Sequence, residues 1–326
     1  MVQARKQKIA MCIPTYNRQD VLKDTLEKYI DVCAGLGIDI YIYDSSTSDD
    51  TEKYCRRLKY GNLYHIRLDS SITLDEKVVK VFQCYQREKE YDYIWLSGDS
   101  MIYSERLLQK VCDAATEEPT VIFLNDDDRQ KLGNRTYLDV KEMYRDLLWR
   151  SPLWGCILIK EELYRNVDWQ KYKSMFVGTD QISVGLHWYR LADAEPFKGT
   201  YLVVEKKVDM FKSSTKKMAW WKGSAAGSEM VYRVWTTGLL TVLDNLPFDS
   251  QVTDEAILNI RKYANMFTIK NLCRSRKDGV YGKEIYEKYR AGLKRLTGHS
   301  DGLLRAIAVA PKLFMKILVK IMDKLS

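Results

Sequence analysis

The stretch Tyr91-Asp92-Tyr93-Ile94-Trp95-Leu96-Ser97-Gly98-Asp99-Ser100 determines the fold class that we predict. Its apolar run, Tyr93 to Leu96, has the length and the aromatic content of a buried strand. The run ends in a turn of small residues that carries a single carboxylate, Asp99. Because an α/β sheet binds its ligands at the carboxyl ends of its strands, Asp99 is a candidate ligand-binding residue.

Apolar runs and helical spacings alternate on both sides of this stretch. We predict further strands at 8–13, 38–43, 63–68, 120–124 and 200–204. We predict helices at 20–34, 51–58, 74–88, 104–116, 140–149 and 181–191. This alternation, with short connections, predicts an α/β fold with a doubly wound, mostly parallel sheet flanked by helices. The pattern then becomes mainly helical, and we divide the chain into domains at 1–215 and 216–326.

The composition is that of a folded protein with an excess of basic residues. The chain is 46% hydrophobic, with eight Trp and 22 Tyr, which suit either a bulky core or the stacking of sugars and bases. Its net charge of +8 suits nucleic acid, an anionic membrane surface or phosphorylated substrates. No nucleic-acid-binding motif accompanies the charge, so we expect no nucleic-acid partner.

Cysteine usage and the absence of targeting segments indicate a cytoplasmic protein. The seven Cys contain no CxxC pair, and their apolar neighbours are typical of buried thiols in a reducing compartment. The three His lie far apart in the sequence and form no zinc signature. Residues 1–8 lack the apolar run of a signal peptide, and no apolar stretch reaches the length of a membrane span.

Four motifs, in order and at matching spacing, resemble those of family 2 glycosyltransferases with the GT-A fold. They are Ile13-Pro14-Thr15-Tyr16-Asn17-Arg18, Ile42-Tyr43-Asp44-Ser45-Ser46-Thr47-Ser48-Asp49-Asp50-Thr51, Tyr93 to Ser100, and Gly178-Thr179-Asp180. The resemblance covers about the first 215 residues. It implies a GT-A catalytic domain, a nucleotide-sugar donor and a glycosyltransferase activity of the hexosyltransferase class.

The resemblance also implies where the donor binds. The implied contacts with the nucleotide-sugar are Pro14, Thr15, Tyr16, Asp44, Lys77, Gly98 and Asp99. Asp44 can accept a hydrogen bond from a pyrimidine or ribose, or it can cap the helix that follows. Tyr16 can stack on the base or pack in the core. Lys77, like Lys80, can neutralise the diphosphate or lie on a solvated helix face.

Asp99 stands where the family has its Asp-x-Asp motif, which implies bound Mn²⁺ or Mg²⁺. Here Ser97 and Ser100 flank the single acid. One carboxylate with phosphate oxygens and waters is still a normal magnesium arrangement. The alternatives are an acid that binds no metal and an inactive site. Three further acids, Asp126-Asp127-Asp128, are interpreted as a solvated turn.

Asp180 is the candidate general base, because the resemblance places it in the family's Glu-Asp catalytic pair. An inverting transfer needs a carboxylate that takes the proton of the attacking hydroxyl. Thr179 replaces the first acid of the pair. The structural alternative is that Asp180 caps the helix that starts near Gln181.

Three other segments have weaker assignments. Lys216-Lys217-Met218-Ala219-Trp220-Trp221 is interpreted as a lid over the donor, and Trp154-Gly155 as a surface for the acceptor. Residues 312–325 form a predicted amphipathic helix with Lys312, Lys316 and Lys320 on one side. This helix can lie on an anionic bilayer, pack on its own domain or bind a partner subunit.

The function predicted from these observations is inverting transfer of a hexose-type sugar from a nucleotide-sugar, most simply a UDP-sugar. The acceptor is a hydroxyl of a glycan, a lipid-linked saccharide or a glycoprotein, as in polysaccharide biosynthesis at the inner face of a membrane. The alternative is a catalytically silent GT-A domain that binds sugar or protein as an assembly subunit. The single acid of the metal motif motivates this alternative.

Overall fold

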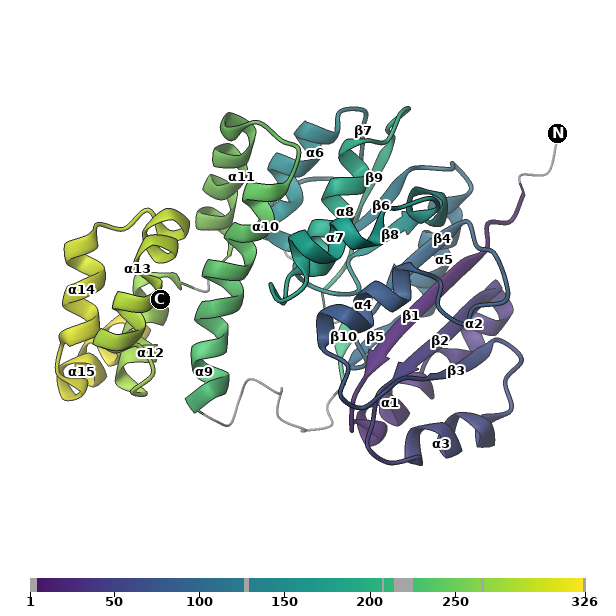
Figure 1. Cartoon of the computed structure of the whole chain (residues 1–326), viewed down its shortest axis with the longest axis horizontal. Coiled ribbons are helices and arrows are strands. Elements are labelled where there is room, and N and C mark those ends of the chain that lie inside the picture. The colour runs from purple at the N-terminus through teal and green to yellow at the C-terminus, as the bar shows by residue number, and fades with distance from the viewer. Residues whose placement is uncertain (1–4, 126–128, 207, 214–224, 265–266, 325–326) are drawn as a thin grey trace.

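The computed structural model describes residues 5–125, 129–206, 208–213, 225–264 and 267–324, and it has an α/β fold (Figure 1). An eight-stranded sheet has the order β3-β2-β1-β4-β8-β6-β9-β7. Its strands are β1 Ile9–Thr15, β2 Ile38–Asp44, β3 Leu63–Arg67, β4 Tyr93–Leu96, β6 Val121–Asn125, β7 Arg135–Tyr137, β8 Ile157–Lys160 and β9 Gly199–Val203. The sheet is mostly parallel, as predicted, and β8 and β7 run antiparallel to their neighbours.

The helices that flank the sheet follow the predicted alternation. They are α1 Gln19–Leu26, α2 Ile30–Leu36, α3 Asp50–Leu58, α4 Leu74–Phe82, α5 Glu105–Ala115, α6 Val140–Leu147, α7 Trp169–Phe176 and α8 Ile182–Ala192, with 3-10 turns η1 Leu148–Arg150 and η2 Glu161–Tyr164. A two-stranded antiparallel ribbon pairs β5 Met101–Tyr103 with β10 Met210–Lys212.

Two helix predictions were wrong in extent. The helix expected over 20–34 is two helices, because the chain turns between them and brings the buried Tyr29 edge-on against Tyr103. The helix expected over 74–88 ends at Phe82, and Cys84 and Gln86 then adopt positive φ, which an α-helix cannot continue.

The C-terminal part is helical, as predicted, and it divides between two hydrophobic cores. Its elements are α9 Ala225–Tyr232, the π-helix η3 Arg233–Gly238, α10 Leu239–Asn245, α11 Ser250–Tyr263, α12 Ile269–Lys277, α13 Lys283–Thr297, α14 Asp301–Val309 and α15 Lys312–Lys324. Helices α10 and α11 bury their apolar faces in the same core as the sheet. Helices α12 to α15 enclose a second core, at the end of the molecule away from β1 (Figure 1).

Membrane-spanning helices and disulfides are both absent from the described part of the chain. Among the described residues, no helix has both the length and the apolar character that crossing a bilayer requires. All seven Cys are free thiols, and five of them are buried.

Candidate active site

The carboxyl ends of β1, β2 and β4 meet at one edge of the sheet. In the parallel register, Thr15 of β1 is opposite Asp44 of β2. Strand β4 runs beside β1 on its other side, and the backbone N–H of Ser97 donates to the carbonyl of Cys12 over 2.9 Å. The turn that carries Asp99 therefore lies beside Thr15, at the edge where ligands bind in α/β sheets.

Asp99 is buried between a hydroxyl and a guanidinium group. Thr15 Oγ1 donates to its Oδ2 over 3.1 Å, and Arg18 Nη1 lies 3.3 Å from its Oδ1. The backbone carbonyl of Asp99 accepts a 2.9 Å hydrogen bond from Thr25. Burial raises the pKa of Asp99, and the opposing effects of Arg18, Thr15 and Lys77 do not outweigh it. Both carboxylate oxygens thus have protein partners.

Lys77 brings a buried cation to the same edge from α4. Its Nζ donates to the carbonyl oxygen of Thr15 over 2.7 Å, and its side chain is buried. Burial lowers the pKa of Lys77 to about 8, while the charges of Asp44 and Asp99 act to raise it. The Tyr16 ring lies over this ammonium at 5.8 Å and is 48% exposed, so Tyr16 is a surface platform and not a core residue.

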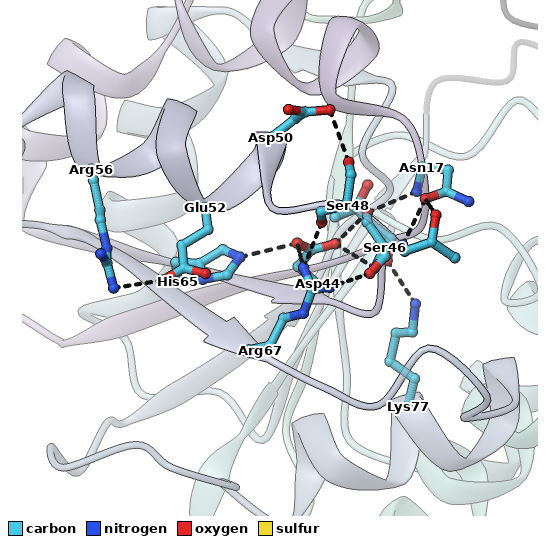
Figure 2. Close-up of polar contacts among 12 residues, drawn as sticks. Asn17, Asp44, Ser46, Ser48, Asp50, Glu52, Arg56, His65, Arg67 and Lys77 are labelled. Carbon is cyan, nitrogen blue, oxygen red and sulfur yellow. Dashed lines mark hydrogen bonds and ion pairs between the residues drawn. The ribbon is translucent and has the colours of Figure 1, made fainter.

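Asp44 is fully buried at the centre of a polar cluster (Figure 2). Its Oδ1 accepts from the backbone N–H of Ser46 over 2.9 Å and from the Ser46 hydroxyl. Its Oδ2 lies 3.1 Å from His65 Nε2 and accepts from Arg67 Nη1 over 3.3 Å. Burial acts to raise the pKa of Asp44, but the hydrogen bonds from His65 and Ser46 hold it below its ordinary value. Asp49, and not Asp44, takes the cap position of α3, although its side chain makes no cap hydrogen bond.

Asp180 lies in a short loop before α8, in the left-handed backbone region with φ 56°. Its Oδ2 contacts Arg233 Nη2 of the π-helix at 2.5 Å. Gly238, one turn further along, packs so closely on this loop that a Cβ there would lie 2.1 Å from the Thr179 carbonyl oxygen. Gln181 takes the cap position of α8 and makes no side-chain cap bond, so Asp180 is not the helix cap.

Asp75, in the first turn of α4, holds the backbone of this loop. Its Oδ2 accepts from the N–H groups of Gly178, over 2.8 Å, and Asp180, over 3.0 Å. Burial, with a smaller effect of the Asp180 charge, raises the pKa of Asp75 to about 6 despite these hydrogen bonds. Because Asp75 and Lys77 lie on the same helix, α4 connects the Asp180 loop to the end of β1.

The other predicted positions lie around this edge. Pro14 is buried in β1, and Gly98 directly precedes Asp99. Lys80 points to the Tyr85 ring, 4.2 Å from its centroid. Trp154 donates to Ser183 over 3.3 Å. The predicted lid, residues 216–221, and the acids 126–128 lie outside the residues that the structure describes.

Three residues near the candidate site had no predicted role: Arg18, Asp75 and Arg233. Arg18 ends the first motif, so its position near the donor site could have been inferred from the motif. Asp75 stands in the first turn of a helix with the capping box Thr73–Glu76, where an acid has an ordinary structural explanation. Arg233 had no sequence signal, because only the tertiary fold brings it to Asp180.

The residues around Asp99 fit a divalent ion only if the ligand supplies most of the donors. Among the described residues, no three Asp, Glu, His or Cys side chains gather into a metal site. Asp99 provides one carboxylate, and Arg18 now contacts it. A hard cation with one protein carboxylate, phosphate oxygens and waters is compatible with this donor set. Such an ion would bind together with a diphosphate, with Arg18 displaced from Asp99.

Comparison with known proteins agrees with this fold. Residues 11–157 match the family model described as Glycosyl transferase family 2. The chain is similar to S. aureus TarS 1–349, with TM-score 0.53 and 11% identity over 92% of this chain and 90% of that chain. A longer TarS structure also matches over 92% of this chain, which spans 55% of it.

Two structures with bound nucleotides are similar as well. TarS 1–349 in complex with UDP has TM-score 0.50 and 10% identity, over 92% of this chain and 90% of that chain. The mannosyltransferase PcManGT from Pyrobaculum calidifontis, in complex with GDP-Man and Mn²⁺, has TM-score 0.51 and 10% identity, over 93% and 86%. No curated protein matches the sequence. At such identities the structural likeness shows the fold alone.

The sheet and its site edge have the arrangement of the GT-A fold. Residues 11–157 of this chain thus resemble glycosyl transferase family 2.

Proposed function

We propose that this protein is a glycosyltransferase that transfers a hexose-type sugar, with inversion, from a UDP-sugar to a hydroxyl of a glycan, lipid-linked or glycoprotein acceptor. The observation that carries the proposal is the position of α4 between two groups of polar residues. Lys77 joins this helix to Thr15, whose hydroxyl donates to Asp99, and Asp75 joins it to the loop of Asp180. Helix α4 thus carries the proposed donor-side cation, Lys77, and also holds the loop of the proposed acceptor-side carboxylate, Asp180.

The donor would bind at the ends of β1, β2 and β4. The exposed ring of Tyr16 would stack on the base, and Asp44 with its partners would face the nucleoside. Lys77 and Arg18 would neutralise the diphosphate. Asp99 would hold Mn²⁺ or Mg²⁺, which when bound stabilises the charge of the leaving diphosphate. The UDP and the GDP-Man with Mn²⁺ in the similar structures support this assignment.

Asp180 would act as the general base on the acceptor side. The acceptor oxygen forms a bond to the anomeric carbon while the bond from that carbon to the phosphate oxygen breaks. The hydroxyl proton passes to the Asp180 carboxylate, and the nucleoside diphosphate leaves. Arg233, which contacts Oδ2 of Asp180, would hold the carboxylate in place for this step.

The alternative function, a silent GT-A subunit that binds sugar or protein, is favoured by one observation. Arg18 contacts the single acid of the metal motif and so stands in for a cation there. In that case the domain would bind a nucleotide or partner without turnover.

The test is to incubate the protein with a panel of nucleotide-sugars and Mn²⁺ or Mg²⁺ and to measure free nucleoside diphosphate. We expect release that Asp99→Asn and Asp180→Asn abolish. Asp278→Asn is the matched control. It changes an exposed acid at the end of α12 and should leave the release unchanged. Nucleotide binding by calorimetry without release would support the silent subunit, and absence of both would contradict the transferase function.

A further inference from the structure

Helix α15 has two apolar faces, and the protein covers only one of them. Met315 and Val319 are buried in the second core, and Leu318 and Met322 pack partly against it. Four large apolar side chains on the remaining surface are exposed: Leu313 by 71%, Phe314 by 56%, Ile317 by 53% and Ile321 by 50%. They recur at the i, i+3 and i+4 spacing of one helix face. We call these four residues the outer face of α15.

Packing within the chain therefore explains only half of the apolar pattern of this helix. The inner face is fixed in place, because Asp323 pairs with Lys270 and Arg274 of α12. The outer face cannot turn inward without exposing Met315 and Val319. An exposed apolar stripe of this kind on a folded helix marks an interaction surface.

The charged residues beside the outer face indicate what kind of partner it binds. Lys316 and Lys320 directly precede Ile317 and Ile321 on the same turns, and Lys312 and Lys324 continue this basic row. All four are exposed, and none forms an ion pair with the described residues. The basic row is thus free to contact an anionic surface.

We propose that the outer face of α15 docks on the surface of an anionic lipid bilayer. The apolar side chains would enter the boundary between headgroups and acyl chains, and the lysines would contact the anionic headgroups. A second copy of the chain is a poorer partner. A twofold interface would place this face against itself and bring the two basic rows together. In Figure 1, α15 lies in the bundle at the far end from β1 to β3, so docking there leaves the donor edge uncovered.

The proposal does not depend on the donor site, and it can be tested without substrates. The full chain is floated in a density gradient with vesicles of phosphatidylcholine alone or of phosphatidylcholine with phosphatidylglycerol. We expect the protein to float with the anionic vesicles and to remain largely unbound with the neutral ones. Each lysine near the surface contributes about fivefold to binding, so Lys316→Glu with Lys320→Glu should reduce it at least tenfold.

Apolar substitutions with a matched control separate insertion from charge attraction alone. Ile317→Ser should reduce flotation several-fold, whereas Leu258→Ser should not, although Leu258 on α11 is equally exposed at 54%. Circular dichroism checks that each variant is folded. Equal flotation of wild type, Ile317→Ser and the double glutamate variant would overturn the proposal. A second result would also overturn it. Light scattering would show a concentration-dependent dimer that Ile317→Ser dissociates, and the vesicles would bind neither wild type nor Ile317→Ser.

Discussion

Lys77 is predicted to make nucleotide binding depend on pH. Burial lowers its pKa to about 8, so the side chain is mostly protonated near pH 7 and neutral near pH 9. The charged groups that face it are Asp44 and Asp99. Because the neutral amine cannot balance diphosphate charge, UDP affinity should fall about tenfold as the pH rises from about 7 to about 9.

Calorimetric titration with UDP across this range measures the effect. Lys77→Arg keeps its charge throughout and is the control, with the decrease in affinity expected to disappear. An equal decrease in the wild type and in Lys77→Arg would show that another group is responsible.

Asp75 is predicted to make stability depend on pH in the opposite way to most carboxylates. Its pKa is raised to about 6, so its contribution to stability is fully present below about pH 4 and is lost as the pH rises through 6. A shift of about 2 units corresponds to at most about 3 kcal/mol. Asp75→Asn cannot ionise, so the difference in the free energy of unfolding between this variant and wild type should grow in favour of the variant as the pH rises from about 4 through about 6, and should then stay constant.

Urea denaturation at about pH 5 and about pH 7.5 gives this difference directly. Asp75→Ala removes the acceptor of the Gly178 and Asp180 N–H groups and should cost about 1–3 kcal/mol at both pH values. A constant difference between wild type and Asp75→Asn would contradict the raised pKa.

The sequence predicted which candidate residues lie together at the strand ends, and it missed the contacts that depend on packing. Asp44, Thr15 and Asp99 follow buried apolar runs, and parallel strands bring their carboxyl ends together. Arg233 contacts Asp180 across 53 residues of sequence (233 minus 180), and no local pattern records this pairing. The partners of Asp44, His65 and Arg67, also come from another strand.

At the level of the elements, six of the eight strands of the sheet were predicted, whereas β7, β8 and the breaks between helices were not. The apolar pattern that spans α1 and α2 continues through the turn at 27–29, so it could not show the break. Strand β8 is largely buried, as are its neighbours β4 and β6, and only its pairing with these two strands shows that it runs antiparallel to them.

The π-helix η3 positions the Asp180 loop through Gly238. A Cβ at Gly238 would lie 2.1 Å from the Thr179 carbonyl oxygen, so Gly238→Ala must displace the loop or the helix. Since misplacement of a catalytic group by about 1 Å can cost about a hundredfold, kcat should fall at least tenfold. UDP affinity should stay unchanged, because the donor edge lies on β1, β2 and β4.

Gly302→Ala is the matched control for this substitution. Gly302 also lies in a helix, but a Cβ there meets open space, and alanine favours the helix by about 1 kcal/mol. Steady-state kinetics with separate kcat and KM values, together with UDP calorimetry, tests the prediction. Equal kcat in wild type and Gly238→Ala would show that η3 does not position the loop.

At the scale of the whole molecule, the chain forms two hydrophobic cores, and the second core begins later in the sequence than the predicted domain boundary. The proposed division near residue 215 follows the change of pattern, but α10 and α11 bury their apolar residues beside the sheet. Only α12 to α15, with Tyr232, enclose the second core. The region that can loosen independently is therefore shorter than 216–326.

Substitution of Leu304 tests this arrangement. Leu304 is fully buried in the second core, and its neighbour Leu303 on α14 is 36% exposed. Leu304→Ala should cost about 2–5 kcal/mol and speed amide hydrogen exchange in α12 to α15, because the cavity it leaves lies among those helices. Amide exchange in β1 to β4 and UDP affinity should stay as in wild type. Leu303→Ala, the control, should change the stability and the exchange in α12 to α15 only little. Faster exchange in the sheet as well as in the bundle would show that the two cores unfold together.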